Sequence, residues 1–188
     1  MNTENINEQG YGLFAKVLHW GIALMVVVLV CVGTYVAGLD KTDPSKMELT
    51  GIHKSFGAIF MMLAIIRVIW SRISNSPALP EVLAPWEKLL SKVVTAALYL
   101  LMLAIPFSGY AMTNLFGYPV SLFGVIDLPV LFSKNPEMAM LVKQAHPILV
   151  YTLMAALFAH IAGALKHRFL DERDADVLPR MMSIKPRA

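Results

Sequence analysis

Four long apolar runs constrain the fold of this chain more than any other feature. They span residues 17–38, 53–73, 93–112 and 147–165. Each can cross the hydrocarbon core of a membrane, which takes about 20 helical residues. Because no water is available there to pair with the backbone, we expect these runs to be helices. The predicted helices cover about 17–38, 52–73, 89–113 and 146–168 of a single membrane domain, 1–188.

The composition supports a membrane protein. Hydrophobic residues make up 57% of the chain and charged residues only 15%, whereas a soluble domain has about 25% charged residues. This balance excludes a disordered chain and a nucleic-acid-binding module, and the single Cys31 excludes a disulfide scaffold. The predicted fold class is all-α, an integral membrane four-helix bundle.

The distribution of basic residues predicts the orientation. Four spans place both termini on one side, which carries eleven basic residues: Lys16, Arg67, Arg72, Lys88, Lys92, Lys166, Arg168, Arg173, Arg180, Lys185 and Arg187. The other side carries five lysines, Lys41, Lys46, Lys54, Lys134 and Lys143, balanced by Asp40, Asp43, Glu48, Asp127 and Glu137. The positive-inside rule therefore places both termini in the cytoplasm.

The histidines sort by depth. His146 and His160 are 14 residues apart, so they share a helix face to within about 40° and are separated by about 21 Å along the axis. His53 lies at the outer end of its helix and His19 at the inner end of another. Pro147 lacks an amide donor, so we expect the fourth helix to start or kink at His146.

Two histidine pairs at two depths suit two b-type haems in the core of the bundle, with His53 and His146 as axial ligands of the outer haem and His19 and His160 of the inner one. A zinc site would require three or four ligands at one depth. A single histidine at a helix end is more often an interfacial side chain, but four in matched pairs favour iron ligands.

Three further residues have two interpretations each. His167 is either a surface residue or a proton donor near an inner quinone site. Arg67 lies at the depth of the inner haem, where it can pair with a haem propionate or a quinone carbonyl, or its side chain can extend to the headgroups. Lys54 can pair with an outer propionate or be a surface lysine.

Glycines recur in the predicted helices, at Gly33, Gly57, Gly109 and Gly163. They can provide room for a porphyrin beside its ligands, or they can allow close packing of membrane helices.

Several motifs together resemble the bacterial di-haem cytochrome b561 family over roughly residues 11–182. They are Leu18-His19-Trp20 after Tyr11; His53-Lys54-Ser55-x-Gly57 followed by Arg67-x-x-Trp70; Ser108-Gly109-Tyr110; Gly117-x-Pro119-Val120-x-x-Phe123-Gly124; His146; and His160 followed by Ala164-Leu165-Lys166-His167.

The resemblance implies a multi-pass bacterial inner-membrane cytochrome with the same four haem ligands. It implies electron transfer across the membrane between an outer, periplasmic donor and the quinone pool, with ubiquinone as the substrate near His167 on the inner side. Some members of the family oxidise superoxide, so a superoxide:quinone oxidoreductase is one expectation, although the balanced outer charges show no strongly positive funnel for superoxide.

Two alternatives remain open at this point. One is a haem-bearing membrane anchor for a soluble redox partner. The other is a four-helix transporter or scaffold without a redox role, whose histidines are incidental. Reduced b-type absorption bands at two haems per chain favour the cytochrome, and the absence of haem excludes it. The sequence indicates no oligomeric state.

Overall fold

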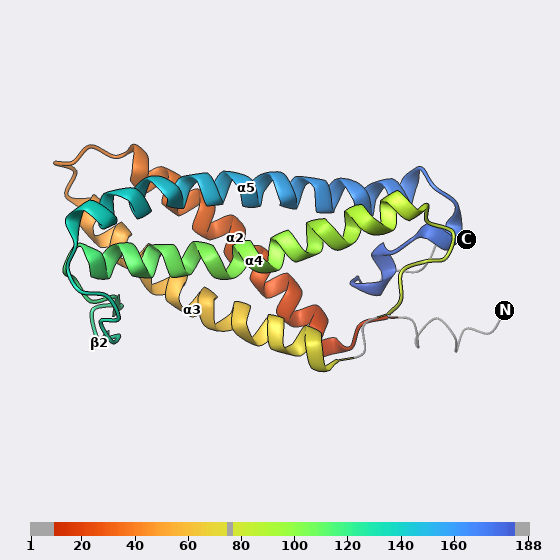
Figure 1. Cartoon of the computed structure of the whole chain (residues 1–188), viewed down its shortest axis with the longest axis horizontal. Helices are drawn as coiled ribbons and strands as arrows, with labels where there is room; N and C mark the ends of the chain where they lie inside the picture. Colours follow the sequence, from red (N-terminus) through yellow and green to blue (C-terminus); the bar gives the residue numbers. More distant parts are fainter. Residues whose placement is uncertain (1–9, 75–76, 183–188) are drawn as a thin grey trace.

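The computed structural model describes residues 10–74 and 77–182. Four long helices dominate it (Figure 1). They are α2 (Leu13–Gly38), α3 (Ser45–Ile73), α4 (Pro85–Leu115) and α5 (Pro136–Phe169). Between α4 and α5, strands β1 (Ser121–Leu122) and β2 (Ile126–Asp127) form a short antiparallel hairpin, and two short 3-10 turns, η1 (Arg173–Ala175) and η2 (Leu178–Arg180), follow α5.

The surface of the helices suits a membrane. All four are long and apolar enough to cross one, yet only 6 to 17% of the residues in their most apolar windows are buried inside the protein. Many large apolar side chains of these helices are exposed, among them Leu24, Leu100 and Phe158, which is stable only if lipid surrounds them. The predicted all-α, four-helix membrane fold is therefore confirmed.

The fourth helix begins ten residues before the predicted start. Asn135 accepts a hydrogen bond from the amide of Met138 and caps the helix, and Pro136 occupies its first turn. The helix then passes through Pro147 without ending. A start at His146 was therefore wrong, whereas a kink at this residue stays a prediction. The apolar run begins only at residue 147, and hydropathy therefore gave no sign of the helical segment in front of it.

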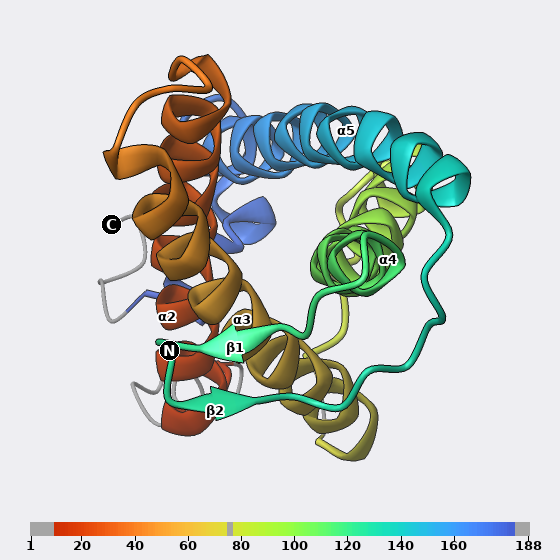
Figure 2. The ribbon, with the colours of Figure 1, turned by 90° about the vertical axis from the view of Figure 1, so that its left-hand side faces the viewer.

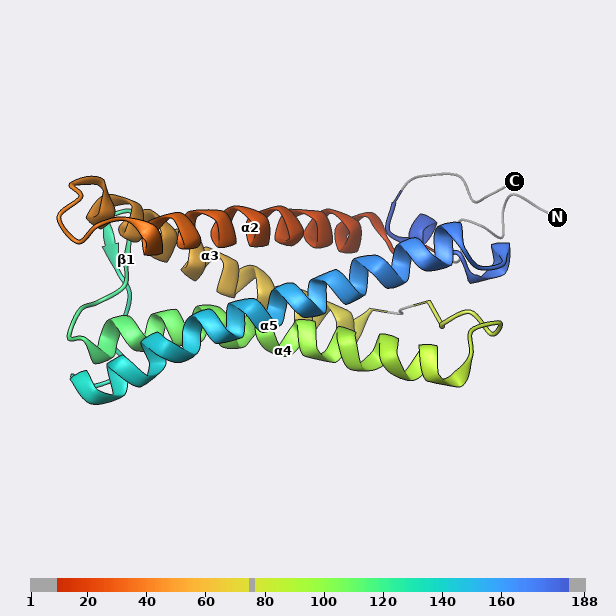
Figure 3. The ribbon, with the colours of Figure 1, turned by 90° about the horizontal axis from the view of Figure 1, so that it is seen from above.

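The helices pack in chain order, α2 on α3, α3 on α4 and α4 on α5. Viewed end-on in Figure 2, α2 and α3 lie side by side, as do α4 and α5. The described chain begins and ends at the same end of the bundle, where the Tyr11 amide donates to the Arg180 carbonyl at 3.1 Å. We call this the terminal end, and the opposite end, which carries the hairpin, the hairpin end (Figure 3).

A buried serine fixes the hairpin on α3. The Ser55 side chain is fully buried, and its hydroxyl accepts a hydrogen bond from the Phe123 amide at 2.9 Å and lies 3.1 Å from the Ser121 carbonyl. Phe123 and Gly124 adopt positive φ angles at the hairpin turn, and the Phe123 ring packs edge-on against Phe56. The hairpin therefore covers the hairpin end of α3 beside His53.

The segment after α5 folds back along the terminal end. Arg168 forms an ion pair with Asp176, and the Trp20 indole donates to the Met181 carbonyl at 3.1 Å. The Arg180 guanidinium donates to the Ala78 carbonyl at 2.6 Å. These contacts hold the segment against α2 and the connection between α3 and α4.

Candidate functional site: two histidine pairs in the bundle

At the terminal end, α2 and α5 bring two histidines together. The ring centroids of His19 and His160 are 6.3 Å apart, and the ring planes are tilted by 57°. The residues lie far apart in the sequence and on two helices that are not neighbours in the packing order. The tertiary structure thus produces the approach that the matched depths predicted.

This separation fits two imidazoles on opposite sides of one metal ion. Each bound nitrogen lies about 2 Å from the metal and about 1 Å from its ring centre, so the two centres would be about 6 Å apart. A direct hydrogen bond between two imidazoles would instead bring the nitrogens to within about 3 Å. The His19 and His160 side chains therefore fit the axial positions of a haem iron.

At the hairpin end, His53 is packed against the backbone of α2. A Cβ atom added at Gly33 would lie 2.9 Å from His53 Cε1, closer than real contacts allow. The Nδ1 atom of His53 is buried and has no hydrogen-bond partner among the described residues. Buried polar atoms nearly always have a partner, so His53 lies where the polypeptide alone does not satisfy the imidazole, as a ligand position would.

His146 is oriented by α4. Its Nδ1 atom lies 2.7 Å from Ser108 Oγ, and that hydroxyl lies 2.6 Å from the Ile105 carbonyl oxygen. A carbonyl can only accept, so the Ser108 hydroxyl donates to it and accepts from the imidazole N–H. The proton on Nδ1 leaves the lone pair on Nε2, as a metal ligand requires.

The glycines divide into two groups. Gly33 and Gly109 touch imidazoles, because an added Cβ at Gly109 would lie 3.5 Å from His146 Cε1. At Gly57 and Gly163 an added Cβ would meet nothing within 4 Å. The first pair lets the backbone approach the rings, and the second leaves open room along α3 and α5 near His53 and His160.

Substitution of Ser108 tests its role at His146. S108A removes the acceptor of the Nδ1–H and is expected to weaken haem retention at this position by about 10- to 100-fold, as is typical when the partner of a metal-ligating histidine is lost. Titration of the haem-free protein with haem measures this affinity. T113S, which keeps a hydroxyl whose partner is the Gly109 carbonyl, is the control. Equal haem affinity in S108A and the parent would contradict the role of Ser108.

Arg67 is buried inside the protein. The residue is only 7% exposed, and its guanidinium donates to the Ala15 carbonyl of α2 at 3.3 Å. Ala15 is one turn before His19, so the cationic group lies at the depth of the terminal-end pair.

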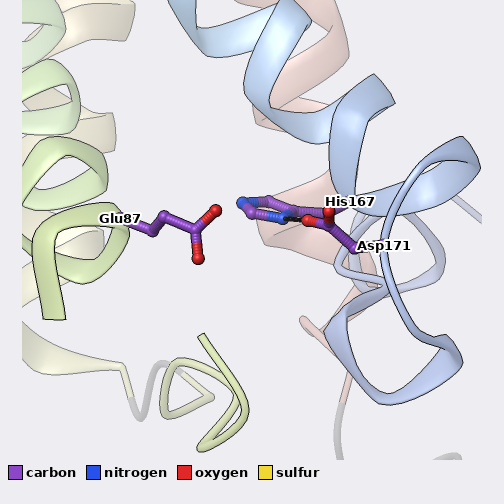
Figure 4. Close-up of side chains that lie close together, drawn as sticks. All are labelled: Glu87, His167 and Asp171. Carbon is purple, nitrogen blue, oxygen red and sulfur yellow. Dashed lines mark hydrogen bonds and ion pairs between the residues drawn. The ribbon is translucent and has the colours of Figure 1, made fainter. Parts of the chain in front are cut away.

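His167 lies in a charged cluster at the terminal end of α5 (Figure 4). Its Nδ1 atom lies 2.6 Å from Asp171 Oδ2, and the ring lies between Asp171 and Glu87 of α4. Lys166 is 2.8 Å from both carboxylates. The hydrogen bonds from Lys166 and His167 lower the pKa of the Asp171 carboxyl. His167 is thus turned toward this cluster, whereas His160 faces His19.

Glu87 and Asp171 were not singled out from the sequence. The i, i+4 spacing of His167 and Asp171 and the position of Glu87 just after Pro85, in the first turn of α4, were the available signals. One ligand atom from each of Glu87, His167 and Asp171 lies within 4.8 Å of the others, so the three residues form a donor set of the type that binds metal ions. The single ammonium group of Lys166 lies 2.8 Å from both carboxylates and offsets part of their negative charge.

Lys54 lies at the hairpin end in the turn of α3 that carries His53. It lines a cleft of about 440 Å³ between the start of α3, the α2–α3 connection and the segment that leads into β1. The structure therefore places Lys54 in the wall of an open cleft, directly next to the predicted outer ligand.

Together, the fold and these contacts define a class: an integral membrane four-helix protein with two histidines near each end of its bundle, of which His19 and His160 face each other. The chain matches the family described as prokaryotic cytochrome b561 over residues 10–183. It is also 32% identical over 172 residues to the protein named cytochrome b561 homolog 2 of Escherichia coli (strain K12), a match that covers 92% of this chain and 90% of that protein.

The chain belongs to the prokaryotic cytochrome b561 family. The resemblance seen in its motifs is thereby confirmed, and so is its place among bacterial membrane proteins that transfer electrons through b-type haem. This class also favours a redox role over a transporter or a scaffold with incidental histidines.

Proposed function

We propose that this protein carries electrons across the bacterial inner membrane through two haems, from a donor at the hairpin end to quinone at the terminal end. The observation that carries the proposal is the approach of His19 to His160, whose centroids are 6.3 Å apart. The Ser108 contact of His146 and the unsatisfied Nδ1 atom of His53 support a second ligand pair.

The protein residues have defined tasks in this scheme. His19 and His160 would hold one haem, and His53 and His146 would hold the other, so that histidine side chains would ligate each iron from the protein. The bound haem supplies a one-electron carrier at each depth. Ser108 fixes the tautomer of His146, while the helices and lipid keep water from the path between the two pairs.

Quinone reduction at the terminal end needs protons as well as electrons. Each ring nitrogen of His167 faces a carboxylate, that of Asp171 or that of Glu87, so the imidazole is placed to exchange protons with its neighbours. The Arg67 guanidinium carries a positive charge at the depth of His19, where it can stabilise a propionate or a quinone carbonyl. This end is the cytoplasmic one if the basic residues orient the chain as the positive-inside rule predicts.

Spectra and donor tests decide this proposal. A reduced-minus-oxidised spectrum and the haem-to-protein ratio of the purified protein are expected to give b-type bands and two haems per chain. The rates of haem reduction by superoxide and by a quinol then identify the donor side. One haem per chain would contradict the two-pair scheme. Reduction only after a soluble dehydrogenase has been added would favour the membrane-anchor alternative.

Removal of the Arg67 charge tests its placement. R67A is expected to lower the midpoint potential of the terminal-end haem by on the order of 50–100 mV, because a nearby positive charge favours the reduced state. A redox titration of the two haems measures the shift, and R67K, which keeps the charge, should shift the potential less. If both the potentials and the rate of quinone reduction are unchanged in R67A, Arg67 serves only to bind Ala15 of α2.

A further inference from the structure

The cleft at the hairpin end has features that the proposed electron path does not use. Its volume of about 440 Å³ lies within the range of about 300–1,000 Å³ that is typical of sites for small organic ligands. One wall is a single face of α3, where Lys46, Thr50 and Lys54 follow one another at four-residue spacing. The α2–α3 connection and the segment leading into β1 form the other walls.

The charge of the cleft differs from that of the side on which it lies. By sequence, five lysines on this side are balanced by five acids. Three of the lysines, Lys41, Lys46 and Lys54, line the cleft, with Asp43 as the one acid among the lining residues. The fold thus places a net positive charge around the cleft. The sum of the charges on this side of the protein does not reveal this local excess.

The acid in the cleft is already engaged. The Asp43 carboxylate accepts hydrogen bonds from the Ser45 amide at 2.8 Å and the Ser45 hydroxyl at 2.6 Å, which hold its pKa below the usual value. Lys46 donates to the Leu39 carbonyl at 2.5 Å, so its ammonium group is held in place and has further N–H groups to offer.

Hydrogen bonds hold the walls of the cleft in place. The Ser55 hydroxyl binds both Ser121 and Phe123, which fixes the segment that carries Tyr118 and Ser121 against α3. On the opposite wall, Gly51 lines the cleft, and an added Cβ there would meet nothing within 4 Å. Gly51 therefore keeps the hollow open between Lys46 and Lys54.

We propose that this cleft is a binding site for an organic anion of metabolite size, whose phosphate or carboxylate group is held by Lys41, Lys46 and Lys54. The volume is far larger than a diatomic anion needs, and the lysines supply charge-assisted hydrogen bonds to oxygen. The anion is either a soluble molecule or the headgroup of an anionic lipid. Only the position of the site at the donor side rests on the proposed function, because binding requires no electron transfer.

Binding to the purified, haem-containing protein tests the inference. Isothermal titration with citrate probes a soluble anion, and mass spectrometry of phosphatidylglycerol retained from mixed vesicles probes a lipid. The double variant K46Q/K54Q is expected to weaken either kind of binding at least tenfold. G51L, which fills the cleft without a change in charge, should do the same. K143Q, which removes an exposed lysine of the same side outside the cleft, should bind like the parent.

The outcomes separate the two sources of the anion. Citrate binding that depends on the cleft indicates a soluble ligand, and retention of phosphatidylglycerol alone indicates a headgroup. If the parent binds neither probe, or if K143Q weakens binding as much as K46Q/K54Q, the inference is overturned. The haem spectrum and the thermal unfolding midpoint show that each variant is folded, and K41Q, which lies in the connection outside α3, repeats the test away from His53. If the parent binds the anion but does not reduce quinone, the result counts against the proposed function and not against the anion site.

Discussion

Replacement of His160 by alanine is expected to remove one of the two haems, whereas replacement of His167 leaves both in place. The structure gives the physical reason, because the His160 ring lies 6.3 Å from that of His19 while the His167 ring lies against Asp171. The haem-to-protein ratio, measured on the pyridine complex of the extracted haem, should fall from two to one in H160A and stay at two in H167A.

The pairing also predicts that H19A and H160A lose the same haem. Redox titration of each variant should then show one remaining component, with the potential of the hairpin-end haem. The opposite result, in which H167A loses a haem and H160A keeps both, would show that the ligand is the more terminal histidine. If H160A loses both haems, the double variant H19A/H160A tests the pairing. Its haem content should equal that of either single variant if the two histidines share one site.

The second large effect is expected at Gly33. This residue has no side chain that could take part in the chemistry, so the effect would be steric. In G33V the side chain would occupy the space of His53 Cε1, which lies 2.9 Å from a Cβ at this position. Because a haem ligand cannot rotate away without losing its bond, we expect the hairpin-end haem to be lost or bound at strongly reduced occupancy. G33A adds the same Cβ atom at 2.9 Å from His53 Cε1, so it should also lower the occupancy of this haem, but less than G33V.

A matched glycine on the same helix provides the control. Gly21 is exposed, and an added Cβ there meets nothing within 4 Å, so G21V should retain both haems. Measurement of haem content together with the thermal unfolding midpoint separates ligand displacement from general destabilisation. If G33V and G21V keep equal haem, Gly33 serves helix packing and the approach of His53 to α2 is not a constraint on the site.

The sequence could predict the parts of the site that depend on a single helix. The 3.6-residue period and the 1.5 Å rise place His146 and His160 on one face of their helix at two depths, whatever surrounds it. The same reasoning assigned Arg67 to the level of His19. Its burial could not be predicted, because it depends on a contact with Ala15 on another helix.

Capping chemistry explains where the predicted helix bounds fell short. The start of α5 at Pro136 depends on Asn135, and the start of α3 at Ser45 follows Pro44 and the engaged carboxylate of Asp43. Hydropathy reports where lipid begins, whereas a helix begins where its first amides find acceptors. At α5 the apolar run begins at residue 147 and the helix at Pro136, so the two points differ by eleven residues.

By itself, the sequence determined the membrane class and the number of spans, and it predicted the relative depths of four histidines, since these follow from local apolarity and helix geometry. The tertiary structure alone decided that His19 meets His160, that Gly33 and Ser108 touch the other pair, and that three lysines surround one cleft. The reason is physical: such contacts join residues on different elements, and they depend on the rotation and tilt of each helix, which only packing against its neighbours sets.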